Sequence, residues 1–373
     1  MEVNITIILA IILILLAVQS YLSTNDVENF ADFHSECKLT NLFGKAAEEH
    51  GLNRNSDNWD YYFPCEYNSC EARIKKFETE VTDKKKIFLI DGCDWPASKM
   101  ALWRLLKEYY GNDSAAMLMP QTYLLDKQED LDKIKNNYNK NQKIKSNFMY
   151  VLKNYAQRQE GLKIVQTYED IMDGYSNGFY LVQDYLYNPL LIDNHKINFR
   201  YYTLIVCREG VVEGYIHQEG FVYYAPKVYD EDDADFDKHI TTGYIDRAIY
   251  DVNPLTLDDF RAYLEKEKTG ASTVWDNNVN KLMHDVVQAI STKVCKNTKL
   301  QHHTLFQLFG SDVAPTNSLT AHLMEINKGP DLDAKDERDT QVKYKMQLDI
   351  FKVIDQVDEN GKPFTNNRFV RVF

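Results

Sequence analysis

The sequence predicts a mixed fold, either α+β or α/β, in which strands and helices share a core. Short runs rich in β-branched and aromatic residues, which favour strands, are spread along the chain. Apolar residues at helical spacing lie between and after these runs. With 373 residues, 44% of them hydrophobic, the chain can bury the cores of two or three modest domains.

The strand-like runs begin in the first quarter of the chain. The first covers residues 87–90 and ends at Asp91 and Gly92, a pair typical of turns. The others cover residues 148–152, 179–185, 201–206, 214–223, 305–309 and 319–326. Strands separated by helical segments imply a sheet that is covered by helices.

Three segments have the spacing of amphipathic helices. In the first, Ser98 suits the N-cap and Gly111 suits the end of the helix. Its apolar stripe is Leu102, Leu105, Leu106 and Tyr109. The second stripe is Val279, Leu282, Met283, Val286, Val287 and Ile290, and the third is Val342, Met346, Ile350 and Val353. We expect all three stripes to face the core.

Other segments carry weaker signals. Residues 23–85 are polar and aromatic with little periodicity, which predicts an irregular or partly helical lead-in. Residues 133–145 are rich in Lys and Asn and predict a surface loop or an exposed helix. The acidic run at 230–237 predicts a solvated loop, with metal or basic-peptide binding as the alternative. The net charge of -13 argues against a nucleic-acid partner, because such partners bind clustered Lys and Arg.

The N-terminus carries an apolar segment. Residues 5–18 contain one polar side chain, Thr6, and no charge. Their length lies between that of a signal-peptide core and that of a spanning helix, which needs about 20 residues. The missing positive charge before the segment favours an uncleaved single-pass membrane anchor over a secretory signal peptide. We expect the globular part to lie in the cytosol.

The six cysteines form no CxxC pair, so neither zinc binding nor thiol redox catalysis is indicated. Cys37, Cys65 and Cys70 lie in one stretch, and this group could include one disulfide or remain reduced. We expect the scattered cysteines to be ordinary buried thiols; they are Cys93, Cys207 and Cys295.

Two cations are expected to converge at the entry of a strand. Lys196, Asn198 and Arg200 alternate with apolar residues, so a strand here would place all three side chains on one face. An exposed sheet edge would give the same pattern.

Oxygen-bearing side chains predict a Mg²⁺ site near the C-terminus. Glu325 and Asn327 are two residues apart among apolar neighbours, and Asp312 precedes them. Such oxygens suit Mg²⁺, and a buried Glu is costly unless it is paired or metal-bound. A buried polar network is the alternative. A symmetric hairpin would not place Asp312 directly opposite Glu325, so spacing alone does not bring the three together.

Lys153 lies at the end of a predicted strand and is followed by a short polar segment with Gly161. A strand Lys with a flexible loop after it can hold nucleotide phosphates. An ordinary surface turn has the same pattern.

Read together, these stretches resemble the tubulin-tyrosine ligase-like family over about three quarters of the chain. The matching segments, in order, are DGCDWPASKMALWRLLKEYYG, MPQTYLL, YVLKNYAQRQEGLKI, LVQDYLYNPLLID, KINFR, HQEGFVYYA, HITTGY, FQLFGSD and MEINKGPDL. Each segment alone is unspecific, whereas the collinear series is specific.

The resemblance implies an ATP-grasp fold of the α+β class, in which two subdomains clamp ATP. Such enzymes activate a protein carboxylate as an acyl phosphate, which the amine of a free amino acid attacks; tubulin is a frequent acceptor. By position, Lys153, Lys196 and Arg200 should hold phosphate groups, the last two at the reacting centre. Gln183, Tyr185 and Leu186 should line the adenine, and Asp312, Glu325 and Asn327 should bind Mg²⁺.

The resemblance also shows departures. The family pattern expects a second glycine at Lys163, an aspartate at Asn198, an arginine at Gln218 and an asparagine at Thr242. The lost cation at Gln218 matters most, because an amide offers only a dipole to a developing negative charge. A membrane-anchored nucleotide-binding pseudoenzyme or scaffold is therefore the alternative to an active ligase.

These observations divide the chain into five parts. Residues 1–22 form the transmembrane or signal-anchor segment, and residues 23–85 form the lead-in. Residues 86–145 form an N-terminal α/β subdomain, residues 146–360 the ATP-grasp domain, and residues 361–373 a C-terminal tail.

Overall fold

The computed structural model describes residues 31–373 with the exception of 56, 67–69, 142–147, 156–160 and 357–365. The apolar segment of residues 5–18, and the membrane anchor predicted from it, lie outside these residues. Within the described part of the chain, no helix is both long enough and apolar enough to cross a membrane.

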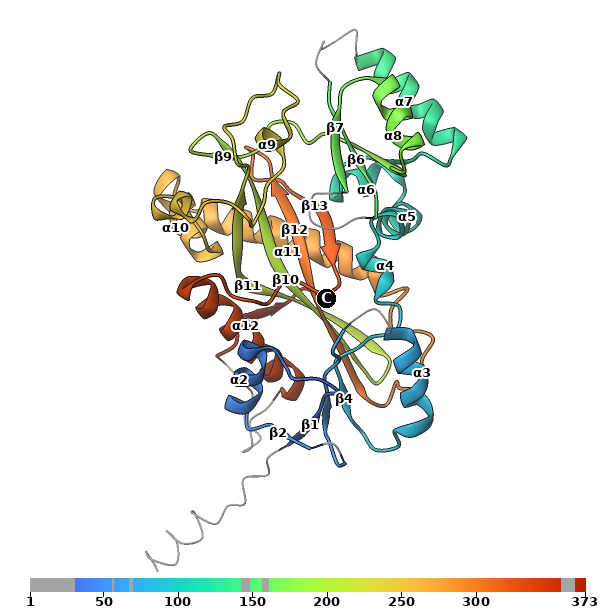
Figure 1. The fold of residues 1–373 in the computed structure, drawn as a ribbon, viewed down its shortest axis with the longest axis vertical. Helices are drawn as coiled ribbons and strands as arrows, with labels where there is room; N and C mark the ends of the chain where they lie inside the picture. The colour runs from blue at the N-terminus through green and yellow to red at the C-terminus, as the bar shows by residue number, and fades with distance from the viewer. Residues whose placement is uncertain (1–30, 56, 67–69, 142–147, 156–160, 357–365) are drawn as a thin grey trace, which may run out of the picture.

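The fold has two sheets, one large and one small (Figure 1). The ten-stranded sheet has the order β14-β11-β10-β12-β4-β3-β1-β2, with β13 beside β12 and β9 beside β10. Its antiparallel part consists of β9 (Leu191–Ile192), β10 (His195–Arg208), β11 (Val211–Tyr224), β12 (Thr304–Pro315), β13 (Ala321–Asn327) and β14 (Phe369–Arg371). Its parallel part consists of β1 (Asp32–His34), β2 (Asn53–Arg54), β3 (Tyr61–Tyr62) and β4 (Lys86–Ile87).

The long central strands are buried because helices cover them. On β10, the Phe199 ring packs 4.6 Å from Phe260 of α10 (Leu257–Glu267) and 4.9 Å from Trp275 of α11 (Ala271–Ile290), measured between ring centroids. Gly214 of β11 lets α11 approach closely, since a Cβ there would lie 2.5 Å from Val287. Residues that alternate with Phe199, including Lys196 and Arg200, therefore belong to the opposite face of the strand.

The small sheet is antiparallel, in the order β5-β8-β6-β7. Its strands are β5 (Thr122–Leu124), β6 (Tyr150–Lys153), β7 (Leu162–Val165) and β8 (Leu181–Asp184). Tyr150 and Leu152 pack into the core with α7 (Gln128–Asn141) and α8 (Tyr168–Ser176). Met149 and Val151 pack on the other side, near Tyr185. Lys153 shares this second side, because it alternates with Leu152.

The lead-in joins the larger sheet. β3 pairs with β4, and β4 pairs with β12, so the sheet runs across the boundary expected between residues 85 and 86. Its helices are α2 (Asn41–Glu49) and α3 (Cys70–Glu80). The Phe43 ring of α2 lies 5.5 Å from that of Phe351 in α12 (Glu337–Asp355), which ties the lead-in to the C-terminal helix.

Most predicted helical features are confirmed. Helix α5 (Lys99–Tyr110) begins after Ser98, whose hydroxyl accepts from the Ala101 N–H, and ends at Gly111, where φ is 81°. The apolar stripes of α11 and α12 are buried. The placement of Tyr109 in the core was wrong: its side chain is 44% exposed. The first predicted strand is shorter than expected, since only its first residue belongs to β4.

The remaining elements connect these layers. They are α4 (Asp94–Ala97), α6 (Asn112–Leu118), α9 (Phe236–His239) and a 3₁₀ helix, η1 (Arg247–Asp251). In the Lys- and Asn-rich segment, the part that the structure describes belongs to α7.

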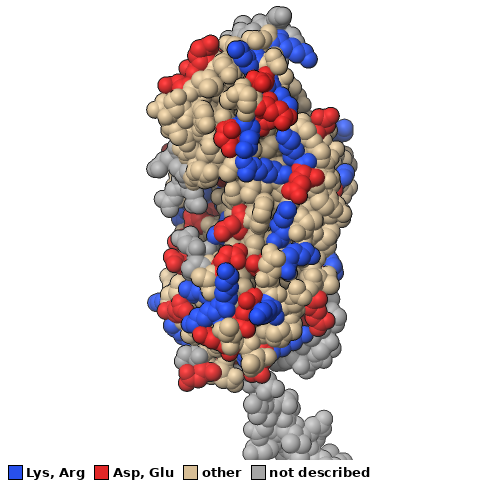
Figure 2. Space-filling view, turned by 90° about the vertical axis from the view of Figure 1, so that its right-hand side faces the viewer, with Lys and Arg blue, Asp and Glu red and all other residues tan. Residues whose placement is uncertain are grey.

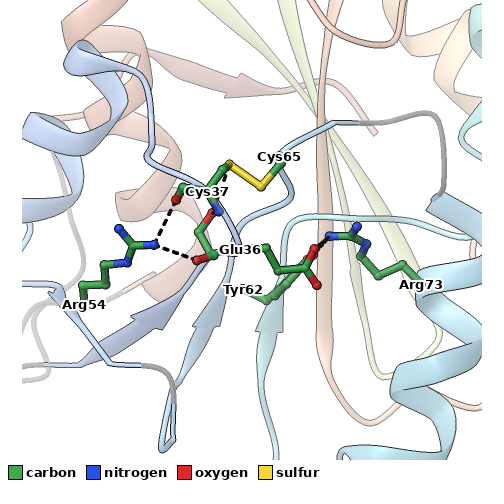
Figure 3. The surroundings of a disulfide bond; sticks show 7 residues. Glu36, Cys37, Arg54, Tyr62, Cys65 and Arg73 are labelled. Atoms are coloured by element: carbon green, nitrogen blue, oxygen red, sulfur yellow. Dashed lines mark hydrogen bonds and ion pairs between the residues drawn. A yellow bond between two sulfur atoms is a disulfide. The ribbon is translucent and has the colours of Figure 1, made fainter.

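The cysteines correct a second prediction. Cys207 and Cys295, predicted to be separate buried thiols, form a disulfide with a Cα–Cα distance of 6.5 Å. Cys37 and Cys65 form another, with a Cα–Cα distance of 5.7 Å (Figure 3). The sequence does not reveal the Cys207 pairing, because 88 residues separate the partners and only the fold brings β10 beside the end of α11.

Candidate active site

Two carboxylates face each other on the hairpin of β12 and β13. Val313 pairs with Leu323, but Asp312 pairs with Glu325, so Met324 is an additional residue on β13. This β-bulge shifts the register by one residue and brings the two acids opposite each other. The Asn327 amide donates to Glu325 Oε1 at 3.2 Å, so all three predicted oxygen-bearing side chains lie together.

Arg200 holds one of these carboxylates. Its Nε and Nη2 donate to the two oxygens of Asp312 at 2.6 and 3.1 Å, the bidentate geometry that suits a planar guanidinium. Burial raises the pKa of Asp312 to about 6, although the Arg200 charge opposes this shift. The pKa of Glu325 is lowered despite its burial, because Lys99 and Lys153 lie close to it.

Lys153 reaches from the small sheet to the large one. Its Nζ donates at 3.3 Å to the carbonyl oxygen of Met324, the additional residue at the bulge. Burial lowers the pKa of Lys153 to about 8, while the nearby Glu325 opposes the shift. One cation thus bridges the two sheets beside the paired carboxylates.

Lys99 is a site residue that the sequence analysis did not single out. It begins α5 directly after the N-cap Ser98, and its Nζ lies 4.0 Å from Glu325 Oε2 and 3.3 Å from the carbonyl oxygen of Asn154. The available signal was a Lys in the matching segment at a helix start. Helical spacing alone assigns such a residue to the solvent face.

Lys196 lies buried without a carboxylate. Its Nζ donates to the Tyr185 hydroxyl at 3.1 Å and lies 4.3 Å from the centroid of that ring. Among the described residues, no acidic side chain forms an ion pair with it. Burial and the positive charge of Lys153 lower the pKa of Lys196 to about 7. An anion bound beside this buried amine would favour its protonated form, so the site is suited to bind a negatively charged group.

The predicted adenine-side residues follow one strand. Gln183 of β8 is fully buried, and its Nε2 donates to Thr122 Oγ1 at 2.9 Å, while its Oε1 has no hydrogen-bond partner. Tyr185 and Leu186 follow in the segment that leads from β8 to β9, and therefore from one sheet to the other. The Tyr185 hydroxyl lies 2.8 Å from Nδ1 of His239.

The departures from the family pattern lie in different places. Asn198, on the strand face of Lys196 and Arg200, has a buried Oδ1 without a partner. Thr242 forms a backbone bridge to Tyr224 at the end of β11. Lys163 lies on β7, 3.9 Å from Asp173 of α8.

Gln218, the departure expected to matter most, lies away from the site. It is exposed at the irregularity of β11, and its N–H donates to the carbonyl oxygen of Arg368. On β11, Arg200 pairs with Phe221, and the ring centroid of Tyr223 lies 5.6 Å from the guanidinium carbon of Arg200. Strand spacing alone could not distinguish these positions, because the irregularity changes the register.

The assembled site combines cations with a few oxygen ligands. Its cations are Lys99, Lys153, Lys196 and Arg200, and its carboxylates are Asp312 and Glu325. Across the described part of the chain, no three His, Cys, Asp or Glu side chains gather as a metal cluster. Mg²⁺ typically binds through one or two carboxylates together with phosphate oxygens and water, so this donor set fits Mg²⁺ carried by a polyphosphate.

The chain is similar in sequence to several known proteins. A probable tubulin polyglutamylase of Caenorhabditis elegans is 26% identical over 184 residues, covering 47% of this chain and 42% of the relative. A tubulin polyglutamylase of Mus musculus is 27% identical over 212 residues, covering 51% and 16%. A tubulin glycylase of Drosophila melanogaster is 24% identical over 226 residues, covering 57% and 30%.

The matched part of the chain thus spans less than half the length of each of these relatives. The family model described as "Tubulin-tyrosine ligase family" matches residues 83–362, which is most of the chain. The protein therefore belongs to the tubulin-tyrosine ligase family.

Proposed function

We propose that this protein is a Mg-ATP-dependent ligase that joins a free amino acid to a carboxylate of an acceptor protein. The main support for this proposal is the hydrogen bond from Lys153 to the carbonyl oxygen of Met324. A cation of the small sheet reaches the bulge that aligns Asp312 with Glu325 on the large sheet. This contact between the two sheets supports the proposal that a nucleotide binds between them, as in an ATP-grasp fold.

The proposed roles follow from charge and burial. Lys153 and Lys196 bind phosphate oxygens, since both are buried amines with lowered pKa values. Gln183, Tyr185 and Leu186 contact the adenine, and the partnerless Oε1 of Gln183 is an acceptor suited to an amino group. Asp312, Glu325 and Asn327 hold Mg²⁺, which neutralises charge on the phosphates when bound.

The proposed reaction has two steps. The acceptor carboxylate oxygen attacks the γ-phosphorus of ATP, the bond to the bridging oxygen breaks, and ADP leaves. The amino-acid nitrogen then attacks the acyl carbon, inorganic phosphate leaves, and the nitrogen loses a proton to form the amide. Arg200 and Lys196 stabilise the developing negative charge. Such electrostatic stabilisation accounts for most of the catalysis of phosphoryl transfer.

Tubulin is one candidate acceptor, because the similar proteins are named as tubulin polyglutamylases and a tubulin glycylase. A net charge of -13 would repel an acidic acceptor tail in the absence of a local basic groove. On the face shown in Figure 2, basic and acidic side chains are interspersed, so this face offers no extended patch of one sign.

The test is product formation by the full chain. The purified protein is incubated with Mg-ATP, mixed amino acids and a library of carboxylate-bearing peptides, and products are identified by mass spectrometry. We expect ADP release that requires both an amino acid and an acceptor. Nucleotide-induced thermal stabilisation without any product would instead support a nucleotide-binding scaffold. The amide of Asn198, where the family pattern has an aspartate, favours this alternative.

A further inference from the structure

The six cysteines, spread from residue 37 to residue 295, meet in pairs in the fold. Four of them form the two disulfides described above. The remaining two, Cys70 and Cys93, are buried free thiols that lie close to each other, and the Cys70 thiol donates to the carbonyl oxygen of Ile90 at 3.6 Å. No cysteine side chain is therefore left as an exposed free thiol, and all six residues belong to the described part of the chain.

The first disulfide is surrounded by supporting contacts (Figure 3). Arg54 donates to the carbonyl oxygens of Ser35 and Cys37 at 3.0 and 3.2 Å. Arg73 pairs with Glu36 at 3.0 Å. These contacts fix the segment after β1, and the bond to Cys65 joins it to the segment after β3. The disulfide thus cross-links the part of the lead-in that enters the large sheet.

The second disulfide lies within the ligase domain. Cys207 is the second-last residue of β10, the strand that carries Lys196 and Arg200, and both bonded cysteines are buried. Cys295 has a φ of 57°, a conformation unfavourable for a residue with a side chain, and its N–H donates to the carbonyl oxygen of Asp91 at 2.9 Å. The bond therefore holds an unusual turn against the end of a site strand.

Disulfides form and persist in oxidising compartments and are rare in the cytosol of ordinary cells. A second, independent feature agrees with such a compartment. The apolar stretch of residues 5–18, whether it acts as a signal or as an anchor, is of the kind that directs a chain into the secretory pathway.

We propose that this ligase works in an oxidising compartment of the secretory pathway, with Cys37–Cys65 and Cys207–Cys295 as structural disulfides, and that its acceptors are proteins of that compartment, not tubulin. The assignment of the acceptors rests on the proposed ligase function, whereas the assignment of the two disulfides does not. The proposal places the globular domain on the opposite side of the membrane from the cytosolic location expected from ATP supply. It also requires Mg-ATP in that compartment.

Thiol counting tests the redox state. The full chain is expressed in eukaryotic cells from its own N-terminus, thiols are trapped by acid, and the denatured protein is labelled with polyethylene-glycol maleimide. We expect two additions before reduction, at Cys70 and Cys93, and six after reduction. Six additions before reduction would overturn the proposal.

Single substitutions make the count specific. Cys207→Ala should give three additions before reduction, because Cys295 loses its partner, and Cys37→Ala should also give three. The matched control Cys70→Ala should give one. In a reduced protein, each of these variants would give five.

Acceptor labelling tests the second part. The full chain with two free thiols is incubated with Mg-ATP and labelled amino acids, in parallel with soluble lumenal proteins of secretory vesicles and with purified tubulin. Labelling of lumenal proteins is expected, and labelling of tubulin alone would overturn the acceptor assignment. If neither is labelled and no ADP forms while the thiol count remains two, the ligase function fails and the oxidised state stands.

Discussion

Asp312 lies directly opposite Glu325 across the β12–β13 hairpin because Met324 is inserted as one additional residue on β13. Without this bulge, the regular register would place Met324 opposite Asp312. The same residue offers its carbonyl oxygen to Lys153 at 3.3 Å. A single irregularity therefore pairs the two carboxylates and also attaches the cation of the other sheet.

Changing Glu325 to Gln should remove Mg-ATP turnover while the fold is retained. The amide keeps the shape of the side chain but loses the charge that a hard cation requires. We expect ADP formation to fall by about 100-fold or more, since even residues that only support metal ligands cost about 10- to 100-fold. The matched control is Glu129→Gln on the exposed side of α7, which should keep full turnover. Unchanged turnover in Glu325→Gln would remove this residue from the metal site.

Nucleotide binding should take up protons near neutral pH. The pKa values of Lys196 and Lys153 are lowered to about 7 and about 8, so both amines are partly neutral at pH 7.5. Phosphate groups restore their charge and so draw protons from the buffer. Calorimetric titration with ATP in buffers of different ionisation enthalpy should show this uptake. Lys196→Arg, which stays charged, should reduce the uptake, whereas Lys281→Arg on the surface of α11 should leave it unchanged.

Changing Lys196 to Met should stabilise the nucleotide-free protein near neutral pH. The pKa of Lys196 is about 7 in the folded state and 10.5 as the ordinary value, so the unfolded state binds more protons between these pH values. The stability of the wild type therefore rises with pH through this window. The Met variant has no amine to deprotonate on folding, so it avoids the loss of stability at lower pH. We expect a gain on the order of 1 to 3 kcal/mol at pH 7 that shrinks toward pH 10. Thermal unfolding across this range measures it, and a gain independent of pH would contradict the buried-charge explanation.

Metal-dependent binding should weaken in acid. The pKa of Asp312 is raised to about 6, so a proton competes with a divalent ion at this carboxylate below that pH. Affinity for Mg-ATP should fall as the pH drops from 7 to 5, and affinity for metal-free ATP should fall less. Asp312→Asn should bind Mg-ATP weakly at both pH values. An equal acid effect on both nucleotides would assign the titration to another group.

Replacing Cys207 with Ala should destabilise the protein through loss of the cross-link. The bond closes a loop of 88 residues, for which loop-closure entropy gives about 4 to 5 kcal/mol. Cys93→Ala serves as the control, because it removes a buried thiol without breaking a cross-link. Denaturant unfolding in the absence of reductant should show the larger loss in Cys207→Ala. If both variants lost the same free energy of unfolding, the cross-link would contribute little stability beyond the packing of the cysteine side chain.

The local features of this protein were determined by sequence alone. The periodicities of α11 and α12, the Ser98 cap and the alternation of Lys196, Asn198 and Arg200 depend on neighbours a few residues away, and the structure contains each of them. The collinear motifs identified the family, because their order reflects the whole chain. The same motifs contain the candidate site residues on β10, β12 and β13.

Tertiary structure alone decided how these parts meet. One inserted residue pairs Asp312 with Glu325, and an irregularity in β11 pairs Arg200 with Phe221 and leaves Gln218 in solvent. The Cys207–Cys295 bond and the approach of Lys99 to Glu325 join residues that lie far apart in the chain. Such features depend on strand register and helix placement, and both are set by the packing of the whole core. No short stretch of sequence therefore encodes them.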